Sequence, residues 1–250
     1  MRFLPFLVLT AILLQLPVRA CASEEGCFIV GYGEKAIPAD LTDGSTYYVA
    51  GYRNDQPATG ILDDQYAKAV YIEDAMGKSV LLISIDCVGL SGAEVSAIRS
   101  SLLGLSKESG CRDIHIVSTH DHAGVDTLGL WGKEGCDGKN ASFSEKLREA
   151  AVEAARLAYA ARTKGDLYFG SADTSASGIQ EDTRLPDVFD PNLYCFRFEP
   201  EDRAIPGIRI VNYASHAESL DADNTLISAD FPAYAAKYVY ESTRERMIWF

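Results

Sequence analysis

The chain has 250 residues, of which 47% are hydrophobic and 24% are charged. A chain of this length and composition forms one large or two small globular domains with a sizeable core, which excludes disordered, collagenous and coiled-coil proteins. Its 36 acidic residues outnumber the 23 lysines and arginines and give a formal net charge of −13. Because this charge repels phosphate backbones, we expect no nucleic-acid partner.

The first residues have the three parts of an export signal. Arg2 supplies positive charge, residues 3–18 are almost wholly apolar, and Ala20-Cys21-Ala22 is a small-residue cleavage site. We therefore expect residues 1–22 to be a signal peptide and residues 23–250 to form an exported domain, periplasmic or extracellular. A second interpretation is a lipoprotein signal that ends before Cys21, which would then be lipidated and would anchor the protein. An uncleaved anchor is disfavoured, since the apolar run is shorter than the ~20 residues that span a bilayer.

The chain contains six cysteines, and an oxidising compartment would allow them to form disulfides. None of them forms a C-x-x-C pair, so a zinc knuckle or a thioredoxin motif is not indicated. Cys87 ends an apolar run and is expected to be a buried free thiol. Cys111 and Cys136 flank a histidine-containing loop, and the sequence is consistent both with a disulfide between them and with two separate core thiols.

Strand and helix patterns alternate in the middle of the chain. Residues 78–87 and 113–119 are β-rich apolar runs, as is typical of buried strands. Residues 91–103 between them have a helical apolar stripe and begin with a capping box at Ser91 and Glu94. This strand–helix–strand order predicts a parallel pair of strands.

The second half continues the alternation. A helix is expected over residues 142–162, capped by Ser142 and Glu145 and ended by Lys164-Gly165. Further elements are expected as short strands over 166–170, 193–198 and 208–214, a helix entered near Asp230, and the start of a strand at 247–250. These elements predict an α/β fold class, a layered sandwich with a mixed or mostly parallel sheet and flanking helices in one domain. Because an apolar strand is an unusual terminus, we expect this domain to be incomplete at its C-terminal end.

Three of the four histidines follow predicted strands. His120 and His122 form T-H-D-H after the strand at 113–119, and His216 follows the strand at 208–214. The carboxyl ends of parallel strands form the binding edge of an α/β sheet, and residues two apart in an extended segment face the same way. Since neutral imidazole is the commonest metal ligand, the pattern predicts a zinc site with His120 and His216 as ligands. His122 is either a third ligand or a base beside the metal, and His115, inside the strand, is expected to be packed or exposed.

Two further residues, one at a strand end and one in a loop, are candidates for the site. Asp86 ends a predicted strand, where it is either a carboxylate near the metal or a residue that caps the next helix. Arg184 lies in a loop rich in turn-forming residues, where its guanidinium would either hydrogen-bond a substrate oxygen or pair with Asp182 or Asp187.

Several segments carry a series of motifs in a fixed order. The early ones are Gly31-Tyr32-Gly33 with Ile37-Pro38, and Val49-Ala50-Gly51-Tyr52. The later ones are S-T-H-D-H-A-G at residues 118–124, and S-H-A-E-S-L followed by N-T-L-I-S-A-D within residues 215–230. In these motifs the chain resembles the N-terminal catalytic region of the neutral/alkaline, non-lysosomal ceramidase family over most of its expected mature length.

The resemblance implies a zinc-dependent hydrolase of an N-acyl amide bond, with a ceramide-like sphingolipid as substrate and attack by zinc-bound water. It implies that His120 and His216 bind zinc, that His122 is catalytic beside the zinc water, and that Arg184 acts in the substrate site. The implied partner is a lipid amide, and peripheral membrane association is compatible with such a substrate. The sequence does not indicate an oligomeric state.

The chain also departs from the family pattern. Family members have further zinc ligands, a glutamate and a tyrosine, and a G-D-V-S-P segment with a functional serine, all after the region that corresponds to Phe250. We therefore expect the 250-residue chain to be inactive in isolation. Glu218 stands where the family has threonine or serine. The alternative function is an exported, non-catalytic binding domain that retains the fold and has lost hydrolase activity.

Overall fold

The computed structural model describes residues 27–250, which divide into two compact units. The first unit comprises residues 29–162 and 216–230, and the second unit comprises residues 27–28, 163–215 and 231–250. The expected signal peptide, residues 1–22, and the lipidation candidate Cys21 lie outside the described residues. Within the described part, none of the helices has the length and apolar character needed to cross a membrane.

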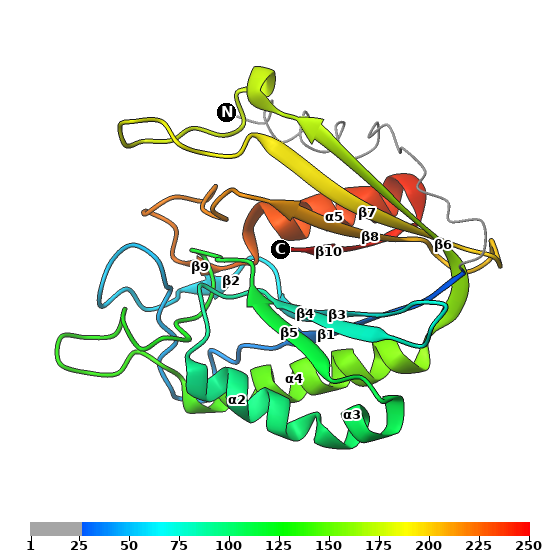
Figure 1. Ribbon diagram of the computed structural model, residues 1–250. Coiled ribbons are helices and arrows are strands. Elements are labelled where there is room, and N and C mark those ends of the chain that lie inside the picture. Colours follow the sequence, from blue (N-terminus) through cyan, green and yellow to red (C-terminus); the bar gives the residue numbers. More distant parts are fainter. Residues whose placement is uncertain (1–26) are drawn as a thin grey trace. The chain divides into compact units, whose positions relative to one another are not determined.

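The first unit contains four long strands in the spatial order β1-β3-β4-β5 (Figure 1). Their bounds are β1 Phe28–Ile37, β3 Gln65–Glu73, β4 Ser79–Ile85 and β5 Asp113–Ser118. β1 pairs with β3, and β3 with β4, in antiparallel fashion, whereas β4 and β5 are parallel. The predicted parallel pair is therefore confirmed. Two short strands, β2 (Gly60–Ile61) and β9 (Leu226–Ile227), form a separate parallel pair in the same unit.

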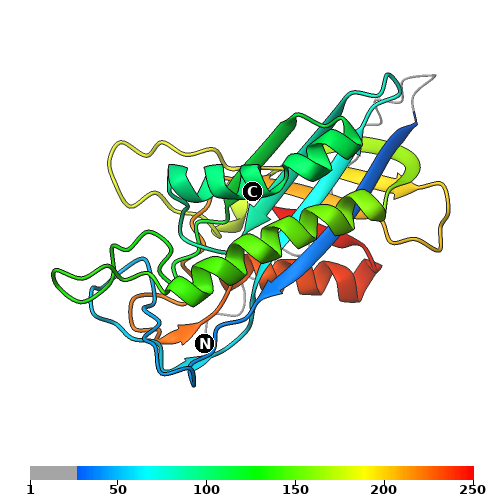
Figure 2. The same cartoon turned by 90° about the horizontal axis from the view of Figure 1, so that it is seen from below.

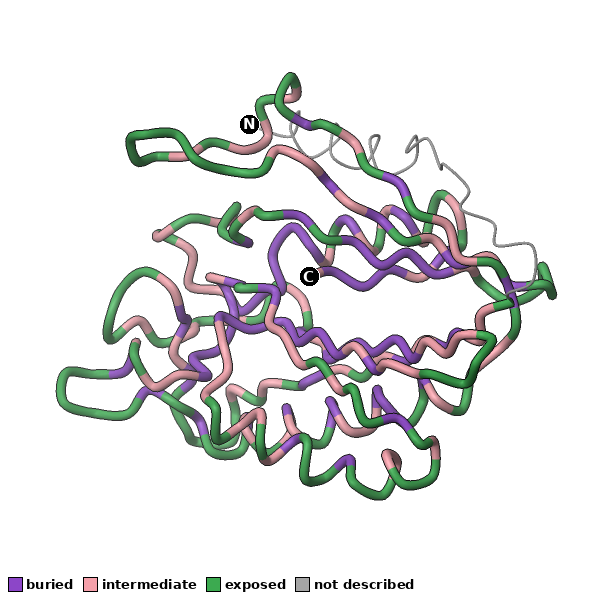
Figure 3. The backbone as a smooth tube through the Cα atoms, in the orientation of Figure 1, coloured by how far each residue is buried: buried purple, intermediate pink, exposed green. Residues whose placement is uncertain are grey.

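Three helices cover one face of these strands: α2 (Gly92–Ser101), α3 (Leu103–Ser109) and α4 (Ala141–Ala160). The inner side of α4 is built mainly from alanines, which lets its backbone approach the sheet closely. A Cβ atom at Gly33 of β1 would lie 2.2 Å from the carbonyl oxygen of Ala154 in α4, so only glycine fits there. Figure 2 shows α4 running along β1 from this side, and Figure 3, in the orientation of Figure 1, shows that the strands it covers are largely buried.

The second unit has the same plan of strands. β6 (Thr163–Asp173), β7 (Asn192–Pro200) and β8 (Ile208–Tyr213) are consecutive and antiparallel, and β10 (Arg246–Trp249) is parallel to β8. A short 3-10 helix, η1 (Ser175–Ser177), follows β6, and α5 (Asp230–Thr243) precedes β10. The ring of Phe231 in α5 meets the ring of Trp249 edge-on at 5.3 Å. The expected α/β class with mixed strand directions is confirmed.

Several local predictions were wrong in detail. α4 is capped by Asn140, whose side chain accepts a hydrogen bond from the Phe143 N–H, rather than by Ser142. Lys164-Gly165 does not end that helix in a turn but lies inside β6, which is longer than predicted. The helix predicted over 91–103 is confirmed as α2 with Ser91 as its cap, but a second helix, α3, follows it and ends at Gly110 in a left-handed conformation. The strands β1 and β3 were not predicted, because neither shows an uninterrupted apolar pattern. Glycines interrupt β1, and the buried Lys68 interrupts β3.

The five described cysteines are all free thiols. Cys87 is buried, as predicted. The proposed clamp between Cys111 and Cys136 is absent, because Cys111 is buried with its thiol 3.6 Å from the carbonyl oxygen of Ser79, whereas Cys136 is exposed.

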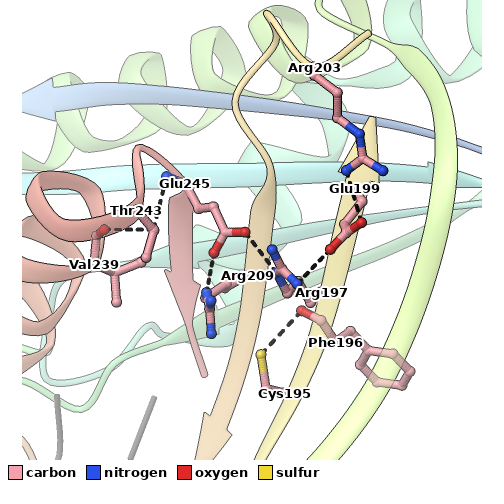
Figure 4. Close-up of polar contacts among 9 residues, drawn as sticks. All are labelled: Cys195, Phe196, Arg197, Glu199, Arg203, Arg209, Val239, Thr243 and Glu245. Carbon is pink, nitrogen blue, oxygen red and sulfur yellow. Dashed lines mark hydrogen bonds and ion pairs between the residues drawn. The ribbon is translucent and has the colours of Figure 1, made fainter. Parts of the chain in front are cut away.

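A chain of alternating charges connects the strands of the second unit to the end of α5 (Figure 4). The buried carboxylate of Glu245 accepts hydrogen bonds from the Nε atoms of both Arg209 and Arg197, the latter at 2.7 Å. Arg197 also pairs with Glu199 at 2.5 Å, and Glu199 pairs with the exposed Arg203 at 2.9 Å. The guanidinium groups of Arg197 and Arg209 thus share the carboxylate of Glu245, which is the buried end of this series of charges.

We predict that Glu245→Ala lowers the free energy of unfolding by about 3–5 kcal/mol, because it leaves the charge of buried Arg209 without the carboxylate that neutralises it. Arg203→Ala, at the exposed end of the same chain of charges, should cost less than about 1 kcal/mol. Urea denaturation of the two variants measures both values. Equal losses of stability would contradict this account.

Candidate metal centre

The loop that carries His120 and His122 continues the pairing of β5 beyond the end of the strand. The Thr119 N–H donates to the Ile85 carbonyl at 3.0 Å, and the Asp121 N–H donates to the Cys87 carbonyl at 3.1 Å. His120, between them, has a φ of 57°, a left-handed conformation that is costly for a residue with a side chain. The backbone therefore turns at His120 while its neighbours stay attached to the segment after β4.

A second loop joins this one from far along the chain. Asp121 and Ala217 form a parallel β-bridge, and the His122 N–H donates to the Ala217 carbonyl at 2.8 Å. The buried carboxylate of Asp230 anchors the same loop, since it accepts hydrogen bonds from the backbone N–H groups of Ser219 and Leu220, each at 3.1 Å. These contacts fix His216 beside the first loop.

The imidazoles of His120, His122 and His216 form one cluster. Their ring centroids are 4.8 Å apart for His120 and His122, 4.5 Å for His120 and His216, and 5.1 Å for His122 and His216. One nitrogen atom from each ring lies within 4.8 Å of the others. Two nitrogens at the usual ~2.1 Å from one zinc ion are at most about 4.2 Å apart, so a small rotation of the rings brings them into range.

The surroundings of His122 favour its uncharged form. Burial, and secondarily the neighbouring His120 and His216, lower the pKa of His122. The Nδ1 atom of His120 lies 2.7 Å from the Val88 carbonyl oxygen, which can only accept a hydrogen bond. The proton of neutral His120 is thereby held on Nδ1, and the lone pair is left on Nε2.

Asp121, between the two histidines of the first loop, is fully buried. Its Oδ1 accepts a hydrogen bond from the Ala123 N–H at 2.8 Å, whereas its Oδ2 is buried without a hydrogen-bond partner among the described residues. Burial raises the pKa of this carboxyl well above its usual range. Asp121 therefore shapes the loop through its hydrogen bond to Ala123.

Three residues enclose His122 on its outer side. The ring of Tyr52 meets the imidazole of His122 edge-on, with the centroids 5.3 Å apart. The Tyr52 hydroxyl donates to the Glu218 carboxylate at 3.2 Å, and burial together with the Glu218 charge raises the pKa of the phenol. Gly51 has a φ of 108°, and a Cβ atom there would lie 2.6 Å from the His122 ring, so the absence of a side chain at Gly51 makes room for the imidazole.

The donor set fits a metal ion. Both ring nitrogens of His122 are buried, and neither has a hydrogen-bond partner in the described part of the chain. Leaving such atoms unsatisfied costs about 1–3 kcal/mol, and a polar group brought to one of them by a cation on the neighbouring imidazoles would offset that cost. Neutral imidazoles are typical ligands of zinc, and the acceptor at Nδ1 of His120 matches the hydrogen bond that usually orients a metal-binding histidine.

The structure brings together the three histidines that the sequence placed after strands. His115 is exposed on β5, one of the two positions expected for it. Asp86 is buried and accepts a hydrogen bond from the Tyr66 N–H at 2.9 Å, so it ties β4 to β3 and does not cap α2, which is capped by Ser91.

Arg184 belongs to the second unit, on an exposed loop where its N–H donates to Asp182 at 3.0 Å. Its role in substrate binding stays a prediction.

Sequence analysis missed the parts played by Gly51, Tyr52 and Glu218. Gly51 and Tyr52 stood out only as parts of a family motif, and Glu218 only as a departure from one. The spacing of Glu218, two residues after His216, was the one available signal, because such spacing puts two side chains on the same side of an extended segment.

Comparison with known proteins identifies the family. The family model for the N-terminal part of neutral/alkaline non-lysosomal ceramidase matches residues 28–248. The chain belongs to this ceramidase family. A comparison with curated proteins gives no match.

Solved ceramidase structures share the fold. The crystal structure of neutral ceramidase from Pseudomonas aeruginosa superposes with a TM-score of 0.70 at 19% identity, covering 90% of this chain and 38% of that one. A structure described as ceramidase complexed with C2 gives a TM-score of 0.68, also at 19% identity, and covers 90% of this chain and 37% of that one. This member of the family thus spans less than two fifths of either solved ceramidase.

We predict that Gly51→Ala displaces the His122 imidazole and lowers the free energy of unfolding by about 1–3 kcal/mol more than Gly44→Ala does. Gly44 is the matched control, because its φ of 80° imposes similar backbone strain whereas a Cβ atom there meets nothing within 4 Å. Thermal unfolding of both variants, with imidazole NMR shifts as a probe of the site, measures the difference. Equal stabilities and unchanged histidine shifts would refute the tight contact.

Proposed function

We propose that this chain is the zinc-binding part of a hydrolase that cleaves the N-acyl amide bond of a ceramide-like lipid. Family membership and the shared fold support this proposal. The observation that carries it is the meeting of three imidazoles from two loops nearly a hundred residues apart. The two ring nitrogens of the central His122 are buried and have no hydrogen-bond partner among the described residues.

In this proposal His120 and His216 hold the zinc ion. Their imidazoles come from loops that the Asp121–Ala217 bridge keeps together, so the ligand pair is preorganised before the metal arrives. Zinc bound there would lower the pKa of a coordinated water to ~7 and polarise a carbonyl oxygen.

His122 acts as the catalytic residue beside the reacting water. Its lowered pKa keeps the ring neutral near pH 7, so it can accept a hydrogen bond and hold a proton during amide cleavage. Tyr52 restricts the ring to one orientation through the edge-on contact. Arg184 is proposed to donate charge-assisted hydrogen bonds to the substrate or to the oxyanion that forms from its carbonyl.

The substrate class follows from the relatives. The family is named for ceramidases, and one similar structure is a ceramidase complexed with C2. We therefore propose a lipid amide as the substrate. We also propose that the protein associates peripherally with the membrane that contains this lipid. The proposed location is outside the cytoplasm, since the sequence begins with the pattern of an export signal.

We predict that the purified chain binds about one zinc ion and that His120→Ala loses most of it, because two neutral ligands hold zinc far better than one. His115→Ala is the matched control, since His115 lies exposed on the same strand that leads to His120. His122→Ala should retain zinc. Metal analysis by mass spectrometry after dialysis reads out all four proteins. A wild-type chain that holds no more zinc than His120→Ala would contradict the proposed zinc site.

We also predict that the 250-residue chain does not hydrolyse ceramide. It covers less than two fifths of the solved ceramidases, and the family pattern places further zinc ligands after the matched region. A zinc-loaded sample with a fluorescent ceramide in mixed micelles provides the assay. Fatty-acid release above the level of a His120→Ala control would show that the described residues suffice for catalysis.

A further inference from the structure

The carboxylate of Glu218 faces two imidazoles of the histidine cluster at once. Its Oε2 atom lies 3.7 Å from Nδ1 of His122 and 3.5 Å from Nδ1 of His216. The side chain is 46% exposed, so the carboxylate sits at the rim of the cluster and not beneath it. Glu218 is not one of the three residues whose ligand atoms converge.

With Glu218 in this position, all three imidazoles favour the same tautomer. Nδ1 of His120 faces the Val88 carbonyl, and Nδ1 of His122 and of His216 face Glu218. The Val88 carbonyl lies within hydrogen-bond distance of His120, whereas Glu218 acts on His122 and His216 through its nearby negative charge. Both kinds of oxygen favour the tautomer with its proton on Nδ1. Every ring then keeps its lone pair on Nε2, as a ligand or a hydrogen-bond acceptor requires.

Tyr52 holds the carboxylate in place. Its hydroxyl lies 3.2 Å from Oε2 of Glu218 and 3.3 Å from the backbone carbonyl oxygen of the same residue. A half-exposed glutamate would otherwise sample several rotamers, so this contact reduces the entropy lost when Glu218 meets the histidines. Tyr52 and Glu218 are 166 residues apart in sequence, and their contact closes the outer side of the cluster.

We propose that Glu218 is a positioning residue that fixes the tautomer and the orientation of His122 and His216 and so raises the affinity of this site for zinc. A carboxylate hydrogen-bonded to the far nitrogen of a metal-binding imidazole typically changes metal affinity by about 10–100-fold. The effect on zinc rests on the proposed zinc site, whereas the effect on the tautomers does not. The two are therefore measured separately.

The first experiment uses the metal-free chain. Long-range proton–nitrogen NMR correlations of its four imidazoles should show the Nδ1-protonated tautomer for His122 and His216, and a mixture of tautomers in Glu218→Ala. Glu134→Ala is the matched control, because Glu134 is an exposed glutamate of the same unit and its removal changes the net charge equally. Nε2-protonated rings in the wild-type chain, or identical tautomers in Glu218→Ala, would overturn the proposal.

The second experiment measures zinc affinity by competition with a chromophoric chelator. Glu218→Ala should bind zinc at least about tenfold more weakly than the wild-type chain, Tyr52→Phe a few-fold more weakly, and Glu134→Ala with unchanged affinity. Equal affinities in Glu218→Ala and wild type would overturn the role in metal binding. A wild-type chain that binds no zinc would refute the proposed function, while the tautomer experiment would still test Glu218 on its own.

Discussion

The parallel bridge between Asp121 and Ala217 is the contact on which the histidine site depends. It joins two loops that each carry histidines and that are separated by nearly a hundred residues. One backbone hydrogen bond contributes only about 0.5–1.5 kcal/mol, so the bridge needs support. That support comes from the pairing of Asp121 with Cys87 on one side and from the anchoring of Ser219 and Leu220 by Asp230 on the other. Several weak contacts on a rigid framework hold the rings in place.

Costly features gather around this bridge. His120 has a left-handed backbone conformation, Gly51 has a φ that side chains rarely adopt, and Asp121 carries a buried carboxyl oxygen without a partner among the described residues. The backbone of His120 and the unpartnered oxygen of Asp121 each cost of order 1–3 kcal/mol and persist only where the surrounding structure enforces them, whereas the glycine at position 51 adopts its φ without such a cost. The rest of the first unit is conventional, with an alanine-lined helix packed on glycines and apolar strands. Strain is thus concentrated at the loops that hold the candidate ligands.

The same contrast explains what could be predicted from the sequence. β4, β5 and α4 were predictable because their apolar residues repeat with the period of a strand or a helix. The expectation that His120 and His122 face one site was correct, but its reason was wrong, since the positive φ of His120 replaces the extended backbone that was assumed. The contact of Tyr52 with Glu218 was not predictable, because a single hydrogen bond between distant loops leaves no periodic pattern.

The two units share one plan of strands, yet they differ in the connection that follows their third strand. In the first unit the chain passes from β4 to α2 through residues 86–91, whereas after β8 the corresponding connection runs through residues 214–229. Most of this longer connection belongs to the other unit. Residues 216–230 are part of the first unit, where they supply His216 and Glu218. Loops after strands tolerate such lengthening, because they lie on the surface and add little closure entropy for each added residue. The connection after β8 thus supplies one of the three imidazoles of the histidine cluster to the first unit.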